Sequence, residues 1–272
     1  MRNNQERMAA SSIEAVQSVF SYVVPTYLVD LPSKGAFYPE GHPLHKKEVV
    51  ELKEMTGKEE DILYNKSFLE KGIVLDKLLI SLLVDRTVNP ASLLTIDKNA
   101  LLLAARVNGY GPEYPIKANC EACGSSFDAV VDLGSLLKIK EPSVKDGVTH
   151  QTSGLLLVTL PQTKWRVLIK PLSGADQDIL QKIAERRKKN KLEENSLIES
   201  MRAFVISIND ETDGDQLYTA LNSMPAKDTK FLRSVYADCF PNITTTSTVS
   251  CTVCGETADM EVPFTLNFFW SK

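Results

Sequence analysis

Two copies of one short motif, Cys-x-x-Cys-Gly, constrain the fold of this chain more than any other feature. The first copy occupies residues 120–124 and the second residues 251–255. Each lies between residues of strand-like character, so each is expected to form a tight turn that presents two thiols, with the glycine allowing the backbone to curl. Two such hairpins facing each other supply the four sulfur ligands of a tetrahedral zinc site, as in a zinc ribbon. The predicted ligands are Cys120, Cys123, Cys251 and Cys254.

The separation of the two motifs along the chain is unusual. Cys123 and Cys251 are 128 positions apart, whereas a compact zinc ribbon separates its cysteine pairs by about 15–20 residues. We therefore expect a discontinuous ribbon, built from residues 116–135 and 247–272, with a large insertion between its halves. One structural Zn²⁺ per chain would close this long loop, and the loop-closure entropy at that length is on the order of 4–5 kcal/mol.

Two other interpretations of the cysteines stay open at this point. Cys-x-x-Cys pairs also occur in thiol–disulfide enzymes, and thiols can be present without a shared function. The polar N-terminus over residues 1–17 carries no apolar core of a secretion signal, and in a reducing compartment cysteine pairs are more often metal ligands than disulfides. Cys239 is expected to be a buried core residue at the end of a helix. Four sulfur ligands leave no open coordination position, so the predicted zinc is structural rather than catalytic.

Charge and composition narrow the function classes. The 272 residues carry a formal charge of −4, with 43% hydrophobic and 24% charged residues, which is ordinary for a soluble globular protein. Nucleic-acid binding usually needs a clustered positive excess. The basic run at residues 186–191 is more simply explained as a solvated helix end than as a phosphate-binding patch. The longest apolar runs, residues 78–84 and 100–105, are far shorter than the ~20 residues that span a bilayer, so no membrane partner is expected.

No catalytic residue is predicted. The three histidines, His42, His45 and His150, are too few and too scattered for a catalytic network. The chain has no glycine-rich phosphate loop and no nucleophile elbow. The acidic cluster at residues 59–61 suits the first turn of a helix better than an acid–base pair. Nothing in the sequence indicates an enzyme, and no small-molecule cofactor site is expected.

Hydrophobic periodicity and turn residues divide the chain into successive parts. In chain order we expect an N-terminal arm (1–24), an N-terminal β unit with helices (25–115), the first half of the ribbon (116–135), a β-hairpin insertion (142–172), a helical region (173–241) and the second half of the ribbon (247–272). The predicted fold class is therefore α+β, with a discontinuous zinc-ribbon domain that encloses a β-hairpin and a helical bundle.

Within these parts, individual elements follow from apolar spacing and capping residues. Strands are expected at 27–31, 48–55, 154–160, 164–171 and 260–270, and helices at 59–68, 75–84, 97–108, 175–187, 194–208, 213–223 and 227–239. Asp97 is expected to cap its helix. The aromatic-rich end of the chain, residues 263–270, is expected to dock either on its own domain or on a partner, because chain ends fray unless they are tied down.

Several short motifs, taken in order, resemble those of a known family. They are Leu31–Pro39 (LPSKGAFYP), Met55–Leu63 (MTGKEEDIL), Asp97 with Arg106 and Tyr110-Gly111, the split Cys-x-x-Cys-Gly pairs, Leu221–Asp228 (LNSMPAKD) and Phe268-Phe-Trp270. The chain is similar over residues 25–272 to the T-even-type baseplate hub assembly family of myophages. Each motif is short, and their shared order makes the resemblance specific.

The resemblance implies a non-enzymatic role in building the baseplate of a contractile tail around its hub. Family members are assembly factors or hub-associated components, so the implied partners are hub, tube or wedge proteins, with a homo-oligomer also possible. The implied location is the baseplate of the virion tail, or the host cytoplasm during assembly. The alternative function is a zinc-ribbon regulator that binds nucleic acid, motivated by the ribbon and by residues 186–191.

Overall fold

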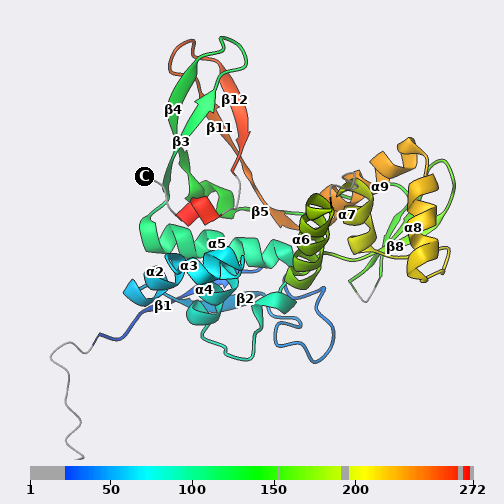
Figure 1. Cartoon of the computed structure of the whole chain (residues 1–272), viewed down its shortest axis with the longest axis horizontal. Helices are drawn as coiled ribbons and strands as arrows, with labels where there is room; N and C mark the ends of the chain where they lie inside the picture. The colour runs from blue at the N-terminus through cyan, green and yellow to red at the C-terminus, as the bar shows by residue number, and fades with distance from the viewer. Residues whose placement is uncertain (1–21, 152–153, 191–195, 263–265, 270–272) are drawn as a thin grey trace, which may run out of the picture.

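The chain has a mixed α+β fold in the computed structural model, which describes residues 22–151, 154–190, 196–262 and 266–269. These residues form eight α-helices, four two-stranded sheets and one four-stranded sheet, and every strand pair is antiparallel. The predicted fold class is therefore confirmed. Figure 1 shows a helical body, two hairpins that rise from it, and a second body of sheet and helices beside it. Most of the predicted N-terminal arm lies outside the described residues.

The N-terminal part begins with a two-stranded sheet. Strands β1 (Thr26–Asp30) and β2 (Val49–Lys53) pair with Val29 opposite Val50, close to the predicted β unit. Three short helices follow: α2 (Gly57–Leu63), α3 (Lys66–Glu70) and α4 (Val74–Leu82). The helix predicted over 59–68 is wrong at Asn65, whose side chain accepts a hydrogen bond from the Phe68 N–H at 3.1 Å and starts a new helix.

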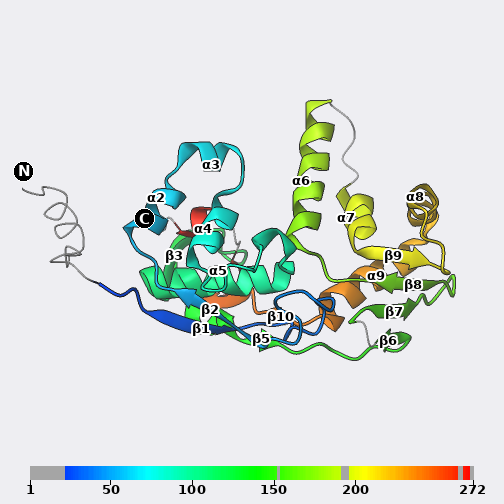
Figure 2. The same cartoon turned by 90° about the horizontal axis from the view of Figure 1, so that it is seen from below.

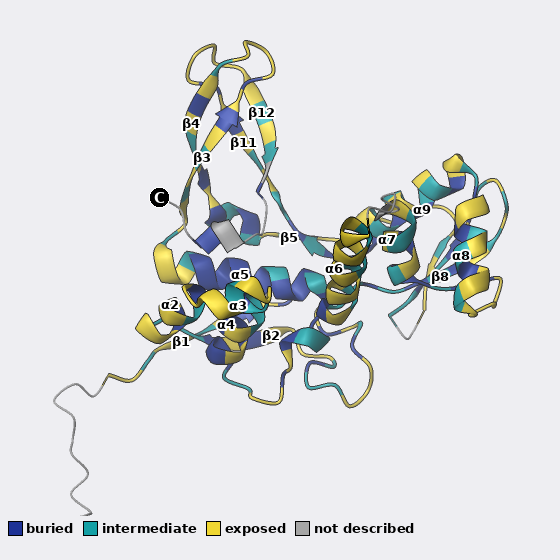
Figure 3. Ribbon diagram, in the orientation of Figure 1, coloured by how far each residue is buried: buried dark blue, intermediate teal, exposed yellow. Residues whose placement is uncertain are grey.

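Helix α5 (Thr95–Tyr110) is the centre of the larger hydrophobic cluster. Every residue from Ala100 to Arg106 is buried (Figure 3), as expected where a helical stretch, here residues 100–105, is apolar on all sides. The predicted capping role of Asp97 is wrong, because the helix begins before it. Its buried carboxylate instead accepts hydrogen bonds from the Ser33 N–H (3.0 Å), the Ser33 hydroxyl (2.6 Å) and the Tyr38 hydroxyl (2.8 Å). Burial raises the pKa of Asp97, and this effect outweighs the opposite effect of the three hydrogen bonds.

Two hairpins stand on one side of α5 and lie side by side in Figures 1 and 3. The first consists of β3 (Glu113–Asn119) and β4 (Ser126–Asp132), and the second of β11 (Thr246–Ser250) and β12 (Thr257–Glu261). Strand β11 packs against β4, which joins the hairpins across more than a hundred residues of sequence. The 3₁₀ helices η2 (Leu133–Leu137) and η3 (Leu266–Phe269) follow the two hairpins. The strand predicted over 260–270 is therefore wrong at residues 266–269.

The chain leaves the part built from α5 and the two hairpins, and re-enters it, at one place. Strand β5 (Ile139–Lys140) carries the chain out, and β10 (Asn242–Ile243) brings it back. The two pair in antiparallel register, with Ile243 opposite Ile139. The described residues between them form the second body.

The second body is a four-stranded sheet with helices packed against it (Figure 2). The strand order is β6 (Val148–His150), β7 (Leu156–Thr159), β8 (Arg166–Ile169) and β9 (Val205–Ile208). The helices are α6 (Gly174–Lys189), α7 (Ser196–Phe204), α8 (Gly214–Ser223) and α9 (Ala226–Cys239). The predicted hairpin of β7 and β8 forms. The helix predicted over 194–208 is wrong at its end, because residues 205–208 add β9 to that hairpin.

Two contacts hold the second body together and to its neighbour. The carboxylate of Asp228 in the first turn of α9 accepts hydrogen bonds from the N–H groups of Gln162 and Thr163, both at 2.8 Å, so it fixes the β7–β8 turn. Phe37 packs against both hydrophobic clusters and meets Phe240 edge to face, with ring centroids 5.6 Å apart.

Candidate metal centre

The two Cys-x-x-Cys-Gly motifs meet at the tip of the paired hairpins. The Sγ atom of Cys120 lies 3.6 Å from that of Cys254, and the Sγ atom of Cys123 lies 3.8 Å from that of Cys251. All four sulfur atoms lie within 4.8 Å of one another. Among the residues described, this is the one group of three or more histidines, cysteines or carboxylates close enough to share an ion. The sequence had singled out the same four side chains.

The two tip loops, here called the knuckles (residues 120–125 and 251–256), have the same backbone geometry. In the first, the Cys120 N–H donates to the Ser125 carbonyl at 2.9 Å and the Gly124 N–H to the Cys120 carbonyl at 2.8 Å. In the second, the Cys251 N–H donates to the carbonyl of residue 256 at 2.7 Å and the Gly255 N–H to the Cys251 carbonyl at 2.9 Å. The local sequence thus builds two equivalent halves of one site.

Each knuckle requires its glycine for conformation rather than for space. The φ angles of Gly124 and Gly255 are +71° and +77°, in the left-handed region that other residues rarely adopt. A Cβ atom added at either position would meet nothing within 4 Å. Glycine therefore follows the second cysteine of each motif because the turn needs a positive φ at that position.

The donor set and its spacing fit a zinc ion. Four thiolates at a Zn–S distance of about 2.3 Å occupy the corners of a tetrahedron whose edges are about 3.8 Å long. The Cys120–Cys254 and Cys123–Cys251 sulfur–sulfur distances, 3.6 and 3.8 Å, match that edge. A disulfide would bring two sulfur atoms to about 2.05 Å, and all the cysteines are free thiols.

The four thiols do not share one protonation behaviour. Hydrogen bonds from the Ser125 side chain and backbone lower the pKa of Cys123 to about 6. The backbone N–H groups of Cys254 and Val253 lower the pKa of Cys251, and the Val253 N–H lies 3.4 Å from its sulfur. For Cys254, hydrogen bonding with the Glu256 backbone lowers the pKa, but its contacts with Cys123 and Cys120 outweigh this and raise it to about 12. The cluster therefore contains sulfurs already disposed to be thiolates, the form that binds metal.

The hairpins are anchored on α5 by a buried arginine. Arg106 is 1% exposed, and its guanidinium donates hydrogen bonds to the carbonyl oxygens of Phe268 (3.1 Å), Gly111 (2.9 Å) and Glu113 (3.4 Å). It thereby ties the start of β3 and the segment after β12 to the same helix. In the sequence, Arg106 belongs to one of the motifs that carry the family resemblance, and no local pattern indicates its role. Its position directly after the apolar run at residues 100–105 was the signal that it is buried.

Expectations from the sequence also concern the C-terminal segment, Cys239, the basic run and membrane spans. Phe268 and Phe269 are 1% and 4% exposed and belong to the larger cluster, so this part of the C-terminal segment docks on its own chain. Residue 270 lies outside the described residues. Cys239 is fully buried in the second cluster at the end of α9, as predicted, and the basic residues 186–189 form the last turn of α6. No helix in the described ranges is long and apolar enough to cross a membrane.

Comparison with known proteins identifies the family. A family model described as "T4 bacteriophage base plate protein" matches residues 24–270, nearly the whole chain. The chain belongs to the T4 bacteriophage base plate protein family. Neither the curated proteins nor the solved structures contain a match. The matched range contains both knuckles and the residues between them.

Proposed function

We propose that this protein is a hub-associated component or assembly factor of a contractile-tail baseplate, which acts by binding other tail proteins and contains one structural zinc ion. The observation that carries the proposal is the family match over residues 24–270. The ordered motifs shared with hub assembly proteins support the specific link to the hub. The proposed partners are hub, tube or wedge proteins.

The zinc role rests on the four cysteines. We propose Cys120, Cys123, Cys251 and Cys254 as the ligands of Zn²⁺, because their sulfur atoms have the spacing of a tetrahedral site. A zinc held by four thiolates has no open position for substrate or water. The proposed role of the zinc ion is to join the two hairpins, since a single two-stranded hairpin is only marginally stable in water.

The proposed domain organisation follows the two crossings at β5 and β10. Residues 25–115 and the split ribbon (116–135 and 247–272) would form one unit, and the inserted residues 142–172 and 173–241 the other. The two hydrophobic clusters support this division, because the buried residues of the second cluster all fall within residues 156–240. No catalytic role is proposed for either unit.

A nucleic-acid-binding regulator receives less support than the baseplate role. A zinc ribbon that binds nucleic acid by charge needs exposed lysines and arginines. The exposed charged side chains of β3, β4, β11 and the knuckles are mostly carboxylates, with Lys117 as the exception. The basic end of α6 remains the single feature in its favour.

Loss of the protein during infection tests the proposed function. An amber mutation in its gene is expected to abolish complete baseplates, with tail parts accumulating unassembled, and suppression of the amber codon should restore them. Probing purified tails for this chain would then separate a resident component from an assembly factor that leaves. Normal baseplates in the non-permissive host would refute the proposal.

A further inference from the structure

The paired ribbon hairpins expose an excess of negative charge. Residues 113–132 and 246–260 expose six carboxylates, those of Glu113, Glu121, Asp128, Asp132, Glu256 and Asp259. They expose one lysine, Lys117. The resulting excess of negative charge is larger than the formal −4 of the whole chain. Four thiolates around one divalent zinc ion would make the tip more negative still.

The tip of the ribbon also exposes an apolar side chain. Val253, in the second knuckle, is 65% exposed. Glu121 and Glu256 are exposed residues of the same two knuckles. This end of the molecule therefore presents an apolar contact with negative charge around it, which fits a partner surface that is apolar and positively charged.

Helix α6 has a surface of the complementary kind, apolar and positively charged. Gly174 is its one buried residue, and its last turn is entirely basic. Ile179, Lys182, Ile183 and Arg186 follow one another at helical spacing, so the two isoleucines and the two cations lie along one face. Ile179 is 55% exposed, although it is a large apolar side chain. This face of α6 is largely unpartnered in the monomer.

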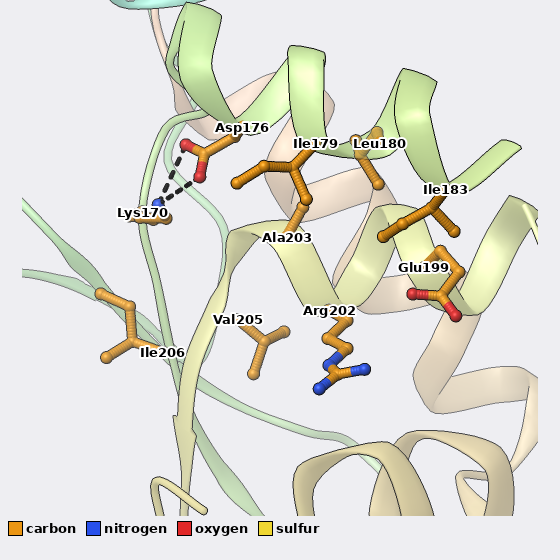
Figure 4. A pocket seen from close by; sticks show the side chains of 10 residues that line it. All are labelled: Lys170, Asp176, Ile179, Leu180, Ile183, Glu199, Arg202, Ala203, Val205 and Ile206. Atoms are coloured by element: carbon orange, nitrogen blue, oxygen red, sulfur yellow. Dashed lines mark hydrogen bonds and ion pairs between the residues drawn. The ribbon is translucent and has the colours of Figure 1, made fainter. Parts of the chain in front are cut away.

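A groove runs between this face of α6 and the opposite wall formed by α7 and β9. Figure 4 shows Ile179, Leu180 and Ile183 on the α6 side, with Val205 and Ile206 on the other. The groove has a volume of about 590 Å³.

The two carboxylates that line the groove already have cationic partners. Asp176 pairs with Lys170 at 2.9 Å, and Glu199 with Arg187 at 3.2 Å. Lys182 and Arg186, on the exposed face of α6, add positive charge along the edge of the groove, and Lys170 and Arg202 are cations within its lining.

We propose that the ribbon tip of one copy docks into the α6 groove of a second copy. Val253 would contact Ile179 and Ile183, while Glu121 and Glu256 would face Lys182 and Arg186. The ribbon and α6 project from the molecule in different directions (Figures 1 and 2), so the contact joins unlike surfaces. A contact of this kind builds either a closed ring or an open chain of copies.

The contact should be weak and sensitive to salt. One groove and one loop tip bury less surface than a standard interface, and exposed charges are screened at high ionic strength. Sedimentation velocity of the zinc-loaded full-length protein at low and high salt measures this directly. Concentration-dependent association at low salt that disappears at high salt is the expected result. A protein that is monomeric at every concentration and salt would overturn the proposal.

Charge reversal identifies the surfaces. Glu121→Lys/Glu256→Lys and Lys182→Glu/Arg186→Glu should each weaken self-association by about tenfold or more, since each turns two attractive pairs into repulsive ones. An equimolar mixture of the two variants should associate again, because each then offers the charge that the other lacks. The control Asp61→Lys/Glu70→Lys has the same change in net charge as the ribbon variant on exposed residues of α2 and α3, and should associate like the wild type.

Three outcomes would contradict the assigned surfaces. Association that is unchanged in both reversed variants would place the interface elsewhere. Failure of the mixture to associate would mean that the two surfaces do not meet each other. The wild type could instead stay monomeric and bind nucleic acid, with that binding lost in Lys182→Glu/Arg186→Glu. This result would assign the groove to nucleic acid and overturn the proposal. Zinc content of each variant verifies that the ribbon is intact.

Discussion

Replacing Cys120 with serine is expected to release the zinc and to lower the free energy of unfolding by about 3–5 kcal/mol. The remaining three thiols belong to two hairpins, and without a complete ligand set nothing covalent joins residues 120–125 to residues 251–256. The unfolded chain then regains the entropy of a loop of more than a hundred residues. Metal analysis and chemical denaturation of the same preparation measure both effects.

The ribbon should respond more strongly than the rest of the chain. Its buried side chains are few, chiefly Ala118, Phe127, Val131 and Val249, so the hairpins have little core to stabilise them without the metal. Limited proteolysis of Cys120→Ser is therefore expected to cut first within residues 113–132, while the second body stays resistant.

Cys239→Ser provides a matched control for this experiment. It makes the same chemical change at a fully buried cysteine that lies in the second cluster. It should lose about 1–3 kcal/mol by placing a hydroxyl in the core, yet retain a full complement of zinc. If Cys120→Ser retained its metal, or were as stable as the wild type, Cys120 would not be a ligand.

Replacing Arg106 with methionine is the second change expected to have a large effect, a loss of about 3–5 kcal/mol. Methionine keeps an unbranched, flexible stem but has no donor, so the carbonyl groups of Gly111, Glu113 and Phe268 lose a charged partner inside the fold. Burial lowers the pKa of the Arg106 guanidinium, but an arginine remains protonated at neutral pH. Urea denaturation measures the loss.

Two further variants distinguish the hydrogen-bonding role of Arg106 from its charge and its bulk. Arg106→Lys keeps the charge but cannot reproduce the planar fork, so it should recover only part of the lost stability. Arg202→Met removes an exposed arginine that lies over the Tyr218 ring, and should cost less than about 1 kcal/mol. A lysine variant as stable as wild type would show that the charge alone matters, and a methionine variant within 1 kcal/mol of wild type would contradict the anchoring role.

The candidate site was predictable because its signal is local. Two thiols three residues apart, followed by glycine, specify a knuckle without reference to the rest of the fold, and both knuckles have that geometry. The long helices α5, α6 and α9 were predictable for a related reason, since an apolar stripe repeated over three or more turns is a strong pattern. Residues 59–61 likewise form part of α2, where Glu59 completes a capping box with Thr56.

The missed elements depend on partners distant in sequence. Strands β5 and β10 contain two residues each, too few for any period to be visible. The segment Val205–Ile208 continues the apolar spacing of α7, and only its run of β-branched residues indicates a strand. It becomes β9 because Val167 and Leu168 of β8 offer an edge to pair with. The link from Arg106 to Phe268 spans 162 residues, and no local rule predicts such a contact.

The metal content of chelator-free protein tests the central claim most directly. Freshly purified chain, never exposed to EDTA or to immobilised nickel, should contain about one zinc per molecule, with X-ray absorption showing four sulfur neighbours at about 2.3 Å. Metal-free protein of undiminished stability, or a zinc bound by fewer than four sulfur atoms, would contradict the account.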